Sequence, residues 1–262
     1  MTPAEILSTD MAEAAETLRA KGQPFAFATI VRTAGATAAK PGAKALLASD
    51  GTLVQGWLGG GCTRGAVKRA AVDAFKTGAP QLVSVAPEDL LAEKGVTPGD
   101  EVDGTRFARN GCPSRGSVDI FIEPCLPMPV LTVVGNSPVA NALSSLAPNF
   151  HWDIKSVVVA AEAHQRHAVV VATQGQGDLD ALKAALETRP DFVAFVGSQR
   201  KFAVLAERLR AAGFDENAIA AVKAPAGADI GAVTPEEIAL SILAELVHQR
   251  RRVFQTQTEA ER

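Results

Sequence analysis

The residues best suited to chemistry are a glycine triplet and the cysteine that follows it, Gly59-Gly60-Gly61-Cys62. Glycine permits positive φ angles and bare backbone, so these N–H groups can close around an anion or an oxygen-rich group at a helix start. A thiol there lies at the positive end of the helix dipole, which lowers its pKa and favours the thiolate. The structural alternative is a tight turn with a buried cysteine that packs as a small apolar side chain.

A second cysteine, Cys112, is also framed by glycine, in the segment Asn110–Gly116. It follows Cys62 by fifty residues, and the two thiols could face one pocket. They lack the Cys-x-x-Cys spacing of a zinc or redox site, so no metal site is predicted.

Two further groups of residues are weaker candidates. The loop Thr33–Lys44 consists of small residues and could present Lys40 or Lys44 to a phosphate; a solvated surface loop is the alternative. His164 and His167 stand close together without a carboxylate or cysteine partner, a pattern that favours a solvated loop or helix start over a metal site.

In the second half, Gly135 ends an apolar run where the dinucleotide fingerprint Gly-x-Gly-x-x-Gly/Ala would stand. The middle glycine is replaced by Ser137, whose Cβ obstructs the close approach of a pyrophosphate. Further along, Ser198 can cap the helix that it opens. Arg200 and Lys201 follow at the edge where doubly wound folds bind ligands, so an anionic group could meet them.

The elements that position these residues fall into two domains. The segment Glu123–Pro129 contains three prolines, which favours a linker because proline cannot join a sheet interior or continue a helix. We therefore predict domains at residues 1–124 and 128–262, and we interpret Cys125, inside the linker, as incidental.

The fold class predicted from these patterns is α/β: a small N-terminal α+β domain followed by a Rossmann-like, doubly wound parallel sheet domain. In the first domain, apolar spacing and the Asp50-Gly51 pair predict helices over 4–20 and 63–76, a strand over 25–31, a hairpin of 43–49 with 52–57, and a strand over 117–123. In the second, nearly continuous apolar runs predict buried parallel strands over 130–134, 154–159, 168–172 and 192–196, alternating with helices over 139–146, 179–188 and 198–212. Thr234 and Glu237 form a capping box for a last helix.

Composition excludes several function classes. The chain has 262 residues, with 26 Lys+Arg against 29 Asp+Glu and a net charge of −3, so it has no electrostatic footprint for nucleic acid. Its longest clean apolar runs reach about five residues where a membrane span needs about twenty. No secretory signal is visible, and three cysteines do not support a disulfide scaffold. We expect a cytoplasmic protein without a membrane span.

Taken together, the motifs resemble those of the XdhC/CoxI family, accessory proteins that mature molybdenum hydroxylases such as xanthine dehydrogenase and aerobic carbon monoxide dehydrogenase. The resemblance covers nearly the whole chain and rests on five ordered motifs: Lys40–Lys44, Gly59–Cys62, Gly111-Cys112, Gly197–Lys201 and Pro225–Ala239.

The resemblance implies a chaperone that binds molybdenum cofactor, plain or nucleotide-extended, assists its sulfuration and inserts it into an apo molybdenum hydroxylase. A cysteine desulfurase is the implied sulfur donor, and we expect a homodimer. No catalytic residue is assigned. We expect the two halves to share one cleft, with the cofactor-binding residues Gly59, Gly60, Gly61, Cys62, Cys112, Gly135, Ser198, Arg200 and Lys201.

The sequence departs from the family pattern in three places. Gly135-Asn136-Ser137 replaces the Gly-x-Gly of the Rossmann loop. The acidic/basic pair expected after the second predicted strand is missing, and only Glu162 is available there for a ribose hydroxyl. Pro113–Gly116 stands where many relatives carry a glycine pair. The last departure indicates a subfamily variant. One alternative is a nucleotide-dependent oxidoreductase with Cys62 as a redox thiol, but the loss of the central glycine counts against it, so NAD(P) and FAD are not expected. The other is a regulatory protein that works only by protein contact.

Overall fold

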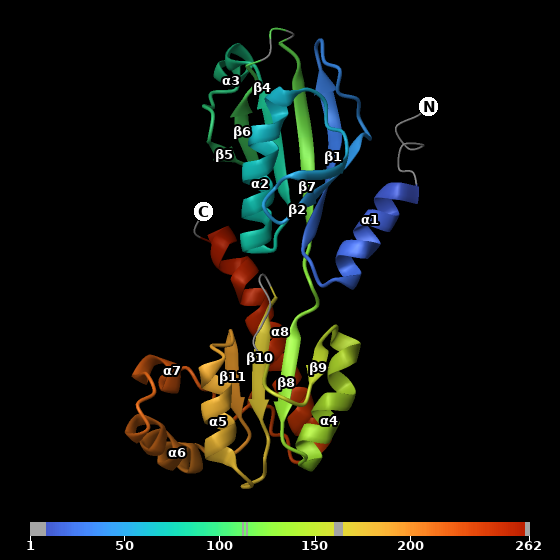
Figure 1. The fold of residues 1–262 in the computed structure, drawn as a ribbon. Helices are drawn as coiled ribbons and strands as arrows, with labels where there is room; N and C mark the ends of the chain where they lie inside the picture. Colours follow the sequence, from blue (N-terminus) through green and yellow to red (C-terminus); the bar gives the residue numbers. More distant parts are fainter. Residues whose placement is uncertain (1–8, 112, 114, 160–164, 260–262) are drawn as a thin grey trace. The chain divides into compact units, whose positions relative to one another are not determined.

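The structure is a computed structural model that describes residues 9–111, 113, 115–159 and 165–259. The chain divides into two compact units, residues 1–127 and 128–262, which are called unit 1 and unit 2 (Figure 1). Each has its own sheet and core, so each is described by itself. No helix within the described ranges is long and apolar enough to cross a membrane.

Unit 1 is an α+β unit, as predicted, built on a mixed seven-stranded sheet with the order β3-β2-β1-β7-β4-β6-β5. β4 and β6 are parallel, and the other neighbouring strands are antiparallel. Its elements are α1 (Thr9–Ala20), β1 (Phe25–Ala34), β2 (Lys44–Ala48), β3 (Leu53–Gly56), η2 (Gly61–Thr63), α2 (Arg64–Thr77), β4 (Gln81–Ala86), α3 (Glu88–Glu93), β5 (Glu101–Val102), β6 (Thr105–Arg109) and β7 (Ser117–Cys125).

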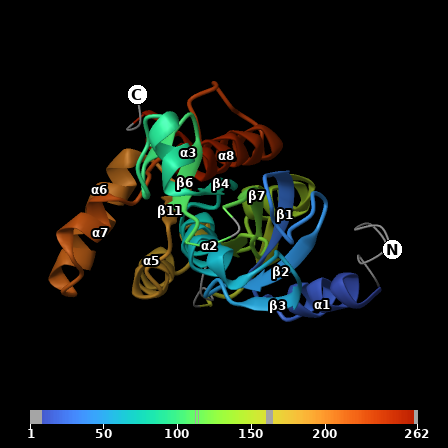
Figure 2. The same ribbon diagram turned by 90° about the horizontal axis from the view of Figure 1, so that it is seen from above.

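Helix α2 packs on one face of this sheet through a row of alanines. Ala66, Ala70 and Ala74 recur every fourth residue, so they share one side of the helix, and all are buried. They join the same core as Ala26 and Ala28 of β1, and small side chains on both surfaces let helix and sheet approach closely. Seen from above, the strands curve around α2, with α1 outside β2 and β3 (Figure 2).

The predicted linker is shorter than expected, because its first three residues belong to β7. Pro124 pairs with Ala26 of β1, whereas the pairing of β7 with β4 stops at Ile122. The strand therefore has one neighbour at Pro124, and the missing N–H of proline is tolerated where a strand has an open side. Cys125 is half-buried at the end of β7, and burial raises the pKa of its thiol.

Unit 2 is a doubly wound Rossmann-like fold, as predicted, with a four-stranded parallel sheet in the order β11-β10-β8-β9. α4 and α8 cover one face, and α5, α6 and α7 cover the other (Figure 1). Its elements are β8 (Val130–Val134), α4 (Pro138–Leu146), η3 (Ala147–Phe150), β9 (Asp153–Lys155), β10 (His167–Val171), α5 (Asp178–Glu187), β11 (Phe192–Phe195), α6 (Gln199–Ala211), α7 (Glu216–Ala220) and α8 (Pro235–Glu259).

The second strand of unit 2 is shorter than the prediction of 154–159. Only Asp153–Lys155 pair with β8. This strand, β9, lies at the edge of the sheet and has β8 as its single neighbour. Val157 is 70% exposed, so the apolar run that suggested a buried strand is partly on the surface. The residues after this run that bear on ribose binding, Ala160–Glu162, lie outside the described residues.

Candidate functional site

Three loops gather at one edge of the unit 1 sheet. The ends of β1, β4 and β6 and the start of β7 lie at this edge, as the pairs Ala34–Ser117 and Ala86–Arg109 show. The loops are residues 35–43, residues 57–63 with the short helix η2, and residues 110–116, and their described residues are called the three-loop cluster. It contains most of the unit 1 residues that the sequence singled out.

Direct contacts join the loops of this cluster. Ala39, which is 2% exposed, packs against Gly59: a Cβ atom at Gly59 would lie 3.2 Å from the Cβ of Ala39. On its other side, the same loop meets Gly116, where a Cβ would lie 2.5 Å from the carbonyl oxygen of Ala36. Loop 35–43 therefore lies between the glycine triplet and the end of the Cys112 segment.

The three glycines of the triplet differ in what the fold requires of them. Gly59 has a φ of +95°, which favours glycine whatever the space around it. Gly60 and Gly61 have no such φ, and a Cβ on either would meet no atom within 4 Å in the described part of the structure, their chain neighbours aside. The fold would accept alanine at both positions, so their bare backbone is free to be approached by a ligand.

The triplet also opens a helix that no side chain caps. Gly60 is the N-cap of η2, which continues directly into α2, and among the described residues no side-chain hydrogen bond caps η2. Thr63 instead donates its hydroxyl hydrogen to the carbonyl oxygen of Gly60 (3.2 Å). The first N–H groups of a helix carry partial positive charge, and the backbone of Cys62 belongs to this first turn, inside η2.

The remaining candidates of unit 1 are only partly described. Cys112 lies outside the described residues, so its position opposite Cys62 stays a prediction. The end of its segment is fixed by Asn110, whose side-chain amide donates to the carbonyl oxygen of Gly116 (2.5 Å). Lys44, the first residue of β2, donates to the hydroxyl oxygen of Thr29 (2.9 Å), and Lys40, in the loop before β2, is exposed.

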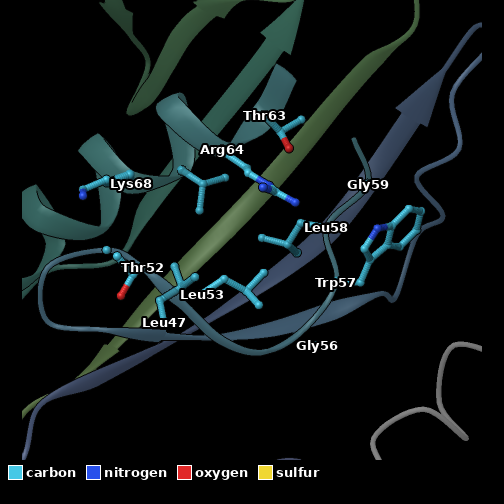
Figure 3. A pocket seen from close by; sticks show the side chains of 12 residues that line it. Leu47, Thr52, Leu53, Gly56, Trp57, Leu58, Gly59, Thr63, Arg64 and Lys68 are labelled. Atoms are coloured by element: carbon cyan, nitrogen blue, oxygen red, sulfur yellow. The ribbon is translucent and has the colours of Figure 1, made fainter. Parts of the chain in front are cut away.

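A pocket of about 410 Å³ adjoins the glycine triplet, between the β2–β3 hairpin and α2 (Figure 3). Gly59 and Thr63 line it, so it opens at the start of the helix. Arg64 extends from that start over Leu58 (Figure 3). Sequence reasoning missed this pocket because its two walls come together only through tertiary packing.

In unit 2, Gly135 has a packing role. It has a φ of +117°, and a Cβ there would collide with the carbonyl group of Ala172 at the end of β10. Ser137, which is buried, accepts a hydrogen bond from the N–H of Ala140 (3.1 Å) and so caps α4. Both residues are thus explained by the fold, without a nucleotide.

Arg200 and Lys201, at the start of α6, differ in their ion-pair partners. As predicted, Ser198 caps α6 by accepting from the N–H of Lys201 (3.2 Å). The Lys201 ammonium lies 2.5 Å from the carboxylate of Asp178, which is 7% exposed. Lys201 is therefore neutralised within the protein, while Arg200 is exposed.

Asp178 is a buried charge that sequence reasoning missed. Besides Lys201, its carboxylate accepts from the hydroxyl of Thr173 and the N–H of Gly175. Burial alone would raise the pKa of this carboxyl, but the bonds from Lys201 and Thr173 outweigh it and hold the pKa below its usual value. An acid at a helix start after two glycines was the only signal in the sequence.

The motif after residue 224 is also anchored by packing. A Cβ at Gly227 would collide with the side chain of Ser241, and the N–H of Gly227 donates to the carboxylate of Glu245 (2.8 Å). Thr234 and Glu237 form the predicted capping box at the start of α8.

The expectation of a solvated His167 is wrong. His167 is the first residue of β10, is 1% exposed, and shares a hydrogen bond of 2.9 Å between its Nε2 and the hydroxyl of Thr132. Burial lowers the pKa of this imidazole, and the charge of Asp191 opposes the shift in part. His164 lies outside the described residues, and within the described ranges no three His, Cys, Asp or Glu side chains gather as metal ligands.

The predicted cleft shared by both halves stays a prediction. Within unit 2, Gly135 and Ser198 both lie at the carboxyl edge of the sheet.

Two family models match the chain: the XdhC and CoxI family over residues 18–86, and the XdhC Rossmann domain over residues 131–246. A curated relative, the uncharacterized protein YqeB of Escherichia coli strain K12, is 28% identical over 256 residues, covering 86% of this chain and 43% of its own length. The chain thus spans less than half of that relative. A crystal structure of a xanthine dehydrogenase from Bacillus halodurans aligns over 92% of this chain and 95% of its own, with 20% identity and a TM-score of 0.41.

Proposed function

The chain belongs to the XdhC and CoxI family, and we propose that it binds molybdenum cofactor at the three-loop cluster and delivers it to an apo molybdenum hydroxylase. Membership of the family suggests a role in xanthine dehydrogenase maturation. The observation that carries the finer proposal is the pair Gly60 and Gly61. Both are glycines that the fold does not require, at a helix start without a side-chain cap.

The residues present suit the chemistry of this cargo. Molybdenum cofactor carries a phosphate, a polar pterin ring and a metal held by sulfur. Bare N–H groups at a helix start suit a phosphate or a pterin edge. A thiolate is a soft ligand, so Cys62 suits molybdenum or a sulfur atom in transit. Assistance with sulfuration by a cysteine desulfurase is part of the proposal for the same reason.

The proposal gives unit 2 no role in binding a dinucleotide. Two residues at its dinucleotide fingerprint already have structural roles: Gly135 packs against the end of β10, and Ser137 caps α4. No observation in unit 2 favours the alternative of a nucleotide-dependent oxidoreductase.

Activation of a client enzyme tests this function. An apo molybdenum hydroxylase is incubated with cofactor, a sulfur source and either the wild-type chain or Cys62→Ser, and hydroxylase activity is followed. The serine variant keeps the volume and removes the soft ligand, so we expect activation to fall at least tenfold. Cys125→Ser is the matched control, because it makes the same substitution outside the three-loop cluster. Cys125 is half-buried at the end of β7. Full activation by Cys62→Ser would contradict the proposal.

A further inference from the structure

The pocket beside the glycine triplet combines an apolar floor with a cationic rim (Figure 3). Its volume of about 410 Å³ suits a small molecule. Leu47, Leu58 and Val67, all buried, form the floor, and the β2–β3 hairpin closes one side. The face of a flat ring can lie on these apolar side chains, while the polar edge of the ring stays hydrated.

Two cations line the same pocket. Arg64 and Lys68 are four residues apart on α2, so they lie on one side of the helix, and both are exposed. Neither takes part in any ion pair found among the described residues. Among the described residues that line the pocket, none carries a carboxylate.

Asp50 interacts with the charge of Lys68, but its hydrogen bonds are made within its own turn. Asp50 stands in the hairpin turn, where its carboxylate accepts from the N–H (2.9 Å) and the hydroxyl (2.6 Å) of Thr52. These bonds, with a smaller contribution from the charge of Lys68, lower the pKa of Asp50. Its carboxylate is therefore engaged within its own turn.

The helix adds to the positive potential at this rim. The first turn of α2 holds no acidic residue, although acids are favoured there, and Arg64 occupies its first position. Two like charges four residues apart and the helix start repel one another, which an anion would relieve.

We propose that this pocket binds a small organic anion, with one face of a flat ring on Leu47, Leu58 and Val67 and a phosphate or carboxylate group held by Arg64. A guanidinium suits such a group because it can donate two parallel hydrogen bonds. The inference rests on the proposed function only in naming a pterin as the occupant, since Gly59 and Thr63 belong both to the pocket and to the site of the glycine triplet.

Calorimetric titration of the full chain tests this inference with two probes, 6-carboxypterin and inorganic phosphate. We expect carboxypterin to bind at least tenfold more tightly than phosphate, because only it can use the floor. Arg64→Gln should weaken carboxypterin binding at least tenfold. Arg69→Gln is the matched control, because this substitution removes the same charge from the same helix. Arg69 is exposed and does not line this pocket.

Three results would overturn the inference: no binding of carboxypterin to the wild-type chain, equal affinity for the two probes, or equal loss in Arg64→Gln and Arg69→Gln. A second variant, Leu53→Asp, places an acid at the rim on an exposed side chain and should also abolish binding. Cys125→Ser should leave carboxypterin binding unchanged, because Cys125 does not line the pocket. Client activation tests the proposed function, and probe binding tests the pocket. The failure of one proposal can therefore be told from the failure of the other.

Discussion

Ala39 and Gly59 are in contact across two loops, with the Cβ of Ala39 3.2 Å from the place where a Cβ of Gly59 would stand. Ala39 is buried, so loop 35–43 forms a fixed support under the glycine triplet. This contact explains why two motifs twenty residues apart belong to one site, which their sequence spacing alone does not show. It also separates Gly59, which supports the loop, from Gly60 and Gly61, which the fold leaves bare.

The first prediction concerns the two bare glycines. Gly60→Ala and Gly61→Ala should leave the thermal midpoint within about 2 °C of the wild type, because neither Cβ meets an atom. Both should lower cofactor retention at least tenfold, because the Cβ occupies the ligand's approach. Thermal melts and pterin analysis of the same preparations measure both effects.

Gly59→Ala is the control for this pair. Its positive φ should make alanine cost about 1 kcal/mol of unfolding free energy. Unchanged cofactor retention in both Gly60→Ala and Gly61→Ala would remove the triplet from the site.

The second prediction concerns Asp178 and Lys201. Lys201→Gln leaves a buried carboxylate without its cation, so we expect it to destabilise the protein by about 1–2 kcal/mol, more than an exposed ion pair would. Asp178→Asn on the Lys201→Gln background should recover part of that loss. A double-mutant cycle from denaturant unfolding measures the coupling, and additive effects of the two changes would contradict the pairing.

The third prediction is a pH dependence that arises from His167. Its pKa is lowered in the folded protein, so the unfolded chain takes up a proton first as the pH falls below the unfolded value of about 6.5. The stabilising contribution is complete above that pH and is lost as the pH falls toward the folded pKa. In His167→Gln, the slope of unfolding free energy against pH just below about pH 6.5 should be smaller; an unchanged slope would assign the pH dependence to other groups.

The fourth prediction is that NAD, NADP and FAD bind no more tightly than high micromolar. Ser137 fills the position where a close pyrophosphate approach needs glycine, and its hydroxyl caps α4. Ser137→Ala should cost about 1 kcal/mol of stability through loss of the cap. Calorimetric titration with the three nucleotides provides the check, and submicromolar affinity for any of them would support the oxidoreductase alternative.

Local signals in the sequence predicted the elements that they encode directly. The Asp50-Gly51 pair predicted the β2–β3 hairpin, and the capping pattern Thr234–Glu237 predicted the start of α8. The buried apolar runs predicted β8, β10 and β11 of the parallel sheet.

Features that depend on distant packing could not be predicted in the same way. The place of Pro124 inside β7 follows from where β4 stops, which no residue near the proline encodes. The pairing of Lys201 with Asp178 joins two helix starts that only the fold brings together. The glycine motif was found from its residue types, but the difference between Gly59 and its two neighbours needed the surrounding atoms.

The cofactor content of the purified protein tests the central claim most directly. The full chain is expressed in a host that makes molybdenum cofactor and purified without oxygen, and its molybdenum and pterin are measured per chain. We predict that both co-purify with the wild type and with Cys125→Ser, and fall at least tenfold in Cys62→Ser. Wild-type protein without pterin, or Cys62→Ser with the wild-type content, would contradict binding at the glycine–cysteine loop.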